Sequence, residues 1–151
     1  SDDSARLAML RMSLASYWLN MLIQDLQSLG RIEWVRPSAD LEHEVEQHCR
    51  VNGGQHEFSY SLRERDSLMV RMTQRSPDES GSVVILTSPG ARAAFAALVK
   101  NSNNFVPVLS TSELEAAGYA IPESVFWRDA CEEAIASPSS FRSPLPLSNH
   151  C

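Results

Sequence analysis

A short turn of small residues, Thr87-Ser88-Pro89-Gly90, is the first place where this sequence could do chemistry. It joins the apolar run VVILT to the helical pattern ARAAFAALVK, and the free amides at a helix N-terminus attract phosphate and other anions. Pro89, however, has no amide proton to donate, and the turn contains neither G-x-x-x-x-G-K-[ST] nor G-x-G-x-x-G. We therefore interpret Ser88 as the N-cap of the next helix and Pro89 as part of its first turn.

The segment EHEVEQHC carries side chains of the types that bind zinc. His43 and His48 are five positions apart, whereas the helical H-E-x-x-H motif places its histidines four apart on one face. With 3.6 residues per helical turn, the two rings are expected to diverge. Cys49 has the spacing of a core residue on the predicted helix, and no second group is placed to activate it. We predict no metal, no cofactor and no cysteine nucleophile here.

Ser110, Thr111 and Ser112 place hydroxyl groups directly after another predicted strand. The nucleophile-elbow pattern G-x-S-x-G is absent, and Ser112 with Glu115 has the spacing of a capping box, which begins a helix. Because the sequence assembles no nucleophile, base and orienting group, we predict that the chain is not an enzyme.

The remaining candidates are charged and aromatic side chains that suit protein partners. They lie on the predicted N-terminal helix and on a predicted acidic helix near the C-terminus, whose ordinary role would be a solvated face. These candidates for protein interaction are Arg6, Arg11, Tyr17, Asp129, Glu132 and Glu133.

Helical and alternating apolar patterns predict the elements that must position these residues. The expected helices cover 4–29, 39–50, 62–75, 89–100, 113–117 and 123–136, and the expected strands cover 31–37, 57–60, 83–87 and 106–109. The helix boundaries rest on caps and stops at Gly30, Ser38, Gly53-Gly54, Ser61 with Glu64, Gly118 and Pro122.

This order of elements predicts an α/β fold, with α+β as the alternative. We expect a long amphipathic helix followed by a small parallel or mixed sheet of about four short strands with flanking helices. The expected division is an N-terminal helix over 1–30, a small α/β domain over 31–136 and a disordered, proline- and serine-containing tail over 137–151.

Composition bounds the function further. The chain has 151 residues, a formal charge of −6 and a pI near 5.2, with no basic face visible in the sequence, so duplex nucleic acid is an unexpected partner. Charged and polar residues interrupt the N-terminal helix, so it is expected to pack rather than insert into a membrane. An odd number of cysteines and an acidic N-terminus favour a cytoplasmic location over secretion.

The region from Asp40 to about Glu123 resembles the last cytosolic subdomain of the export-gate proteins of type III secretion, the FlhA/InvA/SctV type of flagella and injectisomes. The likeness lies in SADLEHEVEQHCRVNGGQHEFSYS, in SLRERDSLMVRM, and most closely in SVVILTSPGARAAFAALVKNSNNFVPVLSTSEL, which ends in the strand VLS and the pair Glu113-Leu114. The N-terminal helix corresponds to a remnant of the preceding helical subdomain. The chain departs from the family in its alanine-rich helix and in the segment after Pro122.

This resemblance implies a mechanical role on the cytosolic side of the bacterial inner membrane. The family's cytosolic domains form a ring that receives chaperone–substrate and gatekeeper complexes and contacts other export-apparatus subunits. Such a ring would require a longer version of the chain, since the membrane half and the first two cytosolic subdomains are not among these residues. Two alternatives stay open: a stand-alone α/β interaction or regulatory module, and a small hydrolase-like or anion-binding enzyme using Ser88 or Ser110.

Overall fold

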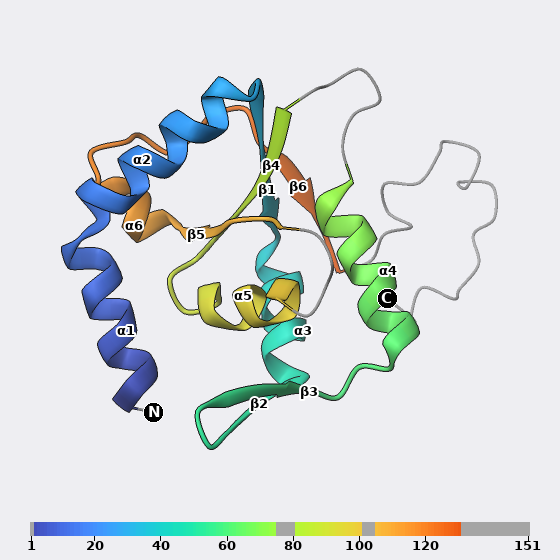
Figure 1. Cartoon of the computed structure of the whole chain (residues 1–151). Coiled ribbons are helices and arrows are strands. Elements are labelled where there is room, and N and C mark those ends of the chain that lie inside the picture. Colours follow the sequence, from blue (N-terminus) through green and yellow to red (C-terminus); the bar gives the residue numbers. More distant parts are fainter. Residues whose placement is uncertain (1, 75–80, 101–104, 131–151) are drawn as a thin grey trace, which may run out of the picture.

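The structure, a computed structural model, describes residues 2–74, 81–100 and 105–130. A four-stranded sheet lies at its centre, in the order β5-β4-β1-β6, and each neighbouring pair is parallel (Figure 1). The strands are β1 (Arg31–Pro37), β4 (Gly81–Thr87), β5 (Val108–Ser110) and β6 (Phe126–Arg128). A separate antiparallel hairpin pairs β2 (Cys49–Asn52) with β3 (Gln55–Phe58). The predicted α/β class is therefore confirmed.

Helices cover both faces of the sheet, as the continuous apolar run of β4 predicts. The helices are α1 (Asp2–Ser13), α2 (Ala15–Ser28), α3 (Ala39–Gln47), α4 (Leu62–Thr73), α5 (Arg92–Lys100) and α6 (Thr111–Ala116). One core joins α3, α4 and α5 to residues such as Val35 and Ile85, with Phe95 fully buried in it. The other joins α2 and α6 to Val84 and Leu86. Alternate residues of one strand thus supply two cores.

The β1–β4 pairing begins at a close backbone contact that only glycine allows. Gly81 pairs with Arg31 and has a φ of 119°, a region that side chains disfavour. A Cβ at this position would lie 2.0 Å from the Arg31 carbonyl oxygen. Gly81 therefore fixes where the central pairing starts.

The prediction of one helix over 4–29 is wrong, because the helix breaks at Leu14. Leu14 has φ −105° and ψ 9°, between α1 and α2. The indole of Trp18 donates to the Arg11 carbonyl at 2.9 Å, and the Arg11 side chain reaches Glu113 on α6. These two tertiary contacts turn α1 away from the axis of α2 (Figure 1).

The prediction of a helix over 39–50 is wrong at its end. Ser38 does cap α3, accepting from the Leu41 amide at 3.1 Å, but the helix ends at Gln47. Gly53 and Gly54 have φ of 62° and 83° and join β2 to β3 as a two-residue hairpin turn. The glycine pair therefore reverses the chain between strands instead of stopping a helix.

Two expected N-caps are also wrong. Ser88 directs both its amide and its hydroxyl to the Glu42 carboxylate, each at 2.8 Å, and α5 begins only at Arg92, after a turn. The second capping box is formed by Ser110 and Glu113, not by Ser112 and Glu115. The last residue of β5 is thus also the cap of α6.

The predicted helix over 123–136 is wrong in its described part. Phe126–Arg128 forms β6, which pairs with the free edge of β1 at Val35, Arg36 and Pro37. Hydrogen bonding to this open strand edge outweighs the local helical pattern. The predicted tail over 137–151 lies entirely outside the described residues. Within the described ranges, no helix combines the length and apolar character required to cross a bilayer.

The capping box that begins α4 gives a first testable prediction. The Ser61 hydroxyl accepts from the Glu64 amide at 3.1 Å, and the Glu64 carboxylate accepts from the Ser61 amide at 2.8 Å, as predicted. We expect Ser61→Ala to lower the free energy of unfolding by about 1 kcal/mol, because it leaves an amide of the first turn unpaired. Urea denaturation measures this loss. Ser59→Ala is the matched control, and an equal loss there would contradict the capping role.

Candidate functional site

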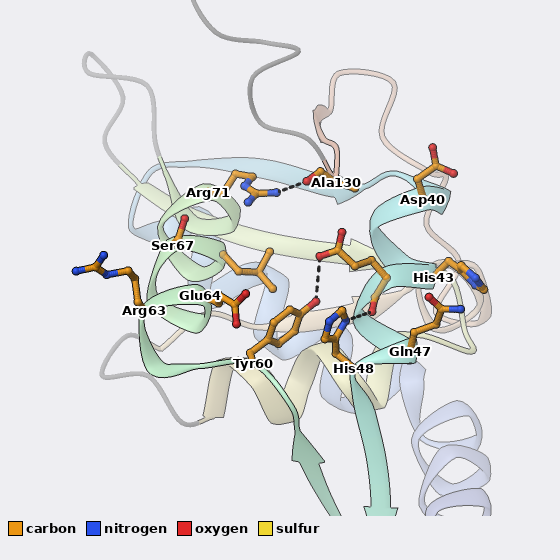
Figure 2. Close-up of a pocket in the computed structure, with 12 residues that line it drawn as sticks. Asp40, His43, Gln47, His48, Tyr60, Arg63, Glu64, Ser67, Arg71 and Ala130 are labelled. Carbon is orange, nitrogen blue, oxygen red and sulfur yellow. Dashed lines mark hydrogen bonds between the residues drawn. The ribbon is translucent and has the colours of Figure 1, made fainter. Parts of the chain in front are cut away.

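The described part of the chain contains an open recess of about 750 Å³ between α3 and α4. Figure 2 shows Tyr60 and His48 side by side at its centre, whereas Arg63 points away from it. Its rim mixes charges: carboxylates come from Asp40, Glu44 and Glu64, and guanidinium groups from Arg63 and Arg71. Histidines 43 and 48 add two imidazoles. The recess is polar and open, which suits recognition of a polar surface more than enclosure of a small apolar molecule.

Tyr60 is fixed in the recess by two neighbours on or next to α3. Its hydroxyl donates to a Glu44 carboxylate oxygen at 3.2 Å, and its ring stacks on His48 with centroids 4.3 Å apart and planes inclined by 9°. The His48 Nδ1 lies 3.0 Å from the Glu44 carbonyl oxygen. Because a carbonyl only accepts, we assign the proton to Nδ1. Glu44 thus anchors both aromatic rings.

The opposite wall is tied to the end of β6. Arg71 of α4 donates to the carbonyl oxygens of Asp129 and Ala130, each at 3.0 Å. The Asp129 carboxylate accepts from the Ser38 hydroxyl at 2.8 Å and from the Ala130 amide at 2.8 Å. These hydrogen bonds join α3, α4 and the end of β6 around the recess, so the shape of the recess is preformed.

The pKa shifts in and next to the recess favour the neutral forms of the Tyr60 phenol and of the nearby Cys49 thiol. Burial, reinforced by the negative charge of Glu44, raises the pKa of Tyr60 above its usual range, so the phenol stays protonated at neutral pH. Ser67 makes no hydrogen bond to either histidine within the described residues. Burial and the charge of Glu46 raise the pKa of the Cys49 thiol, which disfavours the thiolate that a nucleophile needs. The charged and aromatic side chains of the recess can bind polar groups.

The raised pKa of Tyr60 predicts a loss of stability at alkaline pH. The protonated phenol is favoured in the folded chain, so its contribution is complete below the unfolded pKa of about 10 and is lost as pH rises further. We expect the free energy of unfolding to fall less steeply above pH ~10 in Tyr60→Phe than in the wild type. Urea denaturation across pH 8–12 measures this. Tyr17→Phe, at a ring 73% exposed, is the control and should follow the wild type; identical profiles for all three chains would refute the prediction.

The six residues proposed for protein interaction do not form one patch. Arg6 is exposed on α1 and Tyr17 on α2, whereas Asp129 follows β6, across the sheet, and is bonded as described. Glu132 and Glu133 lie outside the described residues. The expected acidic helix face is not present at Asp129, because the chain there leaves a strand.

Arg11, the remaining candidate, belongs to a second polar cluster at the junction of α1, α5 and α6. Its guanidinium makes two hydrogen bonds to the Glu113 carboxylate, at 2.6 and 3.1 Å, and lies 4.4 Å from the centroid of the Trp18 ring. Arg92 of α5 approaches the same carboxylate at 3.8 Å. Glu113 is only 3% exposed. Two arginines thus share one buried carboxylate.

Sequence reasoning missed both Tyr60 with Glu44 and Glu113 with its arginines. The sequence separation of Arg11 and Glu113 is 102 residues, so no local pattern could pair them. A usable signal existed for Glu113: it stands three residues after Ser110, which is the capping-box spacing. For the contact of Tyr60 with Glu44, 16 residues apart in sequence, no local pattern gave a signal.

No protein-family model matches the sequence, and no curated protein matches it. Among solved structures, the C-terminal domain of InvA aligns with a TM-score of 0.56 and 20% sequence identity, over 80% of this chain and 36% of that chain. The MxiA protein of Shigella flexneri aligns at 0.47 with 17% identity, over 82% and 37%. The CdsV protein of Chlamydia pneumoniae aligns at 0.49 with 16% identity, over 81% and 33%.

The likeness to InvA confirms the expected resemblance to an export-gate protein of type III secretion at the level of the fold. The TM-scores of the MxiA and CdsV alignments lie below 0.5. The chain spans about a third of the length of the InvA domain, 36%. The comparison therefore establishes a shared fold and no shared function, because proteins of one fold can have different functions.

Proposed function

We propose that this chain is a non-catalytic interaction domain of a type III secretion export gate, which contributes to a cytosolic ring that receives chaperone–substrate complexes. The observation that carries the proposal is the shared fold with the C-terminal domain of InvA over 80% of the chain. Residues 1–30 then correspond to a remnant of a helical subdomain, and gatekeeper complexes and other export subunits are further partners.

The geometry of the recess agrees with such a role. Tyr60, Glu44 and His48 hold one another in place, and Arg71 fixes the end of β6. A preformed polar surface lowers the cost of binding a protein, because fewer side chains must be ordered on contact. The enzyme alternative uses Ser88 or Ser110. The Ser88 hydroxyl donates to Glu42 and the Ser110 hydroxyl accepts from the Glu113 amide, so both hydroxyls are engaged in structural contacts and we do not favour that alternative.

The proposal is tested by binding to chaperone–substrate complexes from the organism that carries this chain. The immobilised chain is expected to bind the complex in biolayer interferometry, with a slower dissociation than the free chaperone shows. A longer version that includes the preceding subdomains is expected to form rings, visible by mass photometry. Absence of binding by both versions would overturn the proposal. A stable complex with some other protein, without self-assembly, would favour the stand-alone module.

A further inference from the structure

A groove distinct from the recess runs between α1, the β2–β3 hairpin and α5, with a volume of about 340 Å³. Its floor is the face of α5 that carries Ala93, Ala96 and Ala97, and Leu7 and Val51 stand on its sides. Leu7 is 52% exposed and Val51 49% exposed. In Figure 1 the N-terminal part of α1 and the hairpin lie on the same side of α5. The groove therefore offers exposed apolar side walls above a floor of small residues.

The alanines follow the helix period. Ala93, Ala96, Ala97 and Lys100 stand at positions i, i+3, i+4 and i+7 of α5, which places them along one face. This face extends for about 10 Å along the helix axis. Because alanine side chains are short, a second helix or an extended segment can approach this face closely. Large side chains from such a segment would fill the space that the alanines leave.

The charge of the groove is unbalanced toward the positive. Arg11 and Arg92 share the single carboxylate of Glu113. The two guanidinium groups therefore exceed the carboxylate by one positive charge at the Arg92 end of the groove. Lys100 adds another at the opposite end of the α5 face, and Asp3 is the one carboxylate that lines the described groove. Arg92 has a side chain only 13% exposed. The attraction between an anionic partner and a largely buried arginine is stronger than for an arginine in open solvent, because the local dielectric constant is lower.

We propose that this groove binds an acidic amphipathic segment of a partner protein, with apolar side chains on the alanine face of α5 and carboxylates at Arg92 and Lys100. Charge complementarity selects carboxylates, and the apolar floor selects a protein segment over a bare phosphate or a nucleic acid. The inference goes beyond the proposed function, because the shared fold names neither this surface nor the chemistry of its occupant.

Fluorescence anisotropy with the full chain tests the proposal. The probes are a fluorescein-labelled helical peptide of leucine and glutamate, and the same peptide with every glutamate changed to glutamine. We expect the glutamate peptide to bind at least about tenfold more tightly, with an affinity that falls as salt rises. Equal affinity of the two peptides, or no binding by the glutamate peptide, would overturn the proposal.

Two charge-reversing variants locate the binding. Lys100→Glu, at an exposed position at the end of α5, should weaken the glutamate peptide by about tenfold or more. Arg63→Glu changes the net charge equally but lies on α4 in the recess, so it should leave the affinity unchanged. Circular dichroism confirms that each variant folds. Equal weakening by both would show non-specific attraction and refute the groove as the site.

Other occupants give different results. A dimer detected by light scattering and dispersed by Lys100→Glu would make a second copy of this chain the occupant, against the proposal. Displacement of the peptide by millimolar inorganic phosphate, with no loss on changing its leucines to alanine, would also overturn it. Failure here is separable from failure of the proposed function. Chaperone–substrate binding without glutamate-peptide binding refutes only the groove, whereas peptide binding without chaperone–substrate binding refutes only the function.

Discussion

Replacement of Glu113 by glutamine is expected to lower the free energy of unfolding by about 3 kcal/mol. Glu113 is 3% exposed, and its carboxylate accepts two bonds from Arg11 and lies 3.8 Å from Arg92. Glutamine keeps the shape of the side chain but removes its charge. Two guanidinium groups are then left close together without a counter-charge, and burial of unpaired charge is costly.

The same geometry predicts an asymmetry between the partners. Arg11→Gln removes one of the two cations and leaves Glu113 with Arg92 as a one-to-one pair, so its cost should be smaller than that of Glu113→Gln. Burial and the neighbouring Arg11 already lower the pKa of Arg92, which agrees with crowding of positive charge. Urea denaturation of both variants and of the double variant gives the coupling energy.

Glu115→Gln is the control for this cluster, because Glu115 is exposed on the same helix. Its free energy of unfolding should stay within about 0.5 kcal/mol of the wild type. A cost for Arg11→Gln as large as that for Glu113→Gln would show that packing of the Arg11 stem over Trp18, and not charge balance, dominates. An unchanged stability of Glu113→Gln would show that water solvates the arginines.

Phe95→Ala is the second change with a large expected effect, a loss of about 3–5 kcal/mol. Phe95 is fully buried at 0% exposure, in the core that joins α3, α4 and α5 to the sheet. Removal of the ring forfeits its burial and leaves a cavity, which the packed helices can close only in part. The same substitution should loosen the packing of α5 against the sheet, and α5 forms the floor of the groove.

Thermal and urea unfolding measure the effect, and Phe105→Ala provides the matched control. Phe105 is 84% exposed, so the same change of side chain should cost less than about 0.5 kcal/mol there. Phe95→Leu, which refills most of the volume, should recover more than half of the loss. If Phe95→Ala unfolds no more easily than Phe105→Ala, the core assigned to α5 is incorrect.

Among the elements, strand β1 shows what local pattern alone can predict. Its bounds, Arg31–Pro37, coincide with the alternating run RIEWVRP. Every second residue of β1 from Glu33 onward is buried, and this alternation together with the terminal proline is a local pattern. The cap at Ser38 and the capping box at Ser61 with Glu64 were equally local and are confirmed. The expected α/β class followed from such elements in alternation.

Three of the errors lie where a distant part of the chain competes with local preference. Residues 126–128 carry a helical pattern in sequence, but the free edge of β1 offers backbone hydrogen bonds that recruit them as a strand. Ser88 has the position of a cap, but Glu42 of α3 takes both of its donors. The break at Leu14 likewise depends on Trp18 and on a carboxylate from α6.

The amino-acid order by itself determined elements such as β1 and α4, because side-chain periodicity and caps act within a few residues. Only the tertiary structure decided which polar groups meet: Arg11 with Glu113, and Tyr60 with Glu44. Those contacts join elements that are brought together by the packing of two cores on opposite faces of one sheet. Such packing depends on residues far apart in the chain, so no local sequence pattern predicts it.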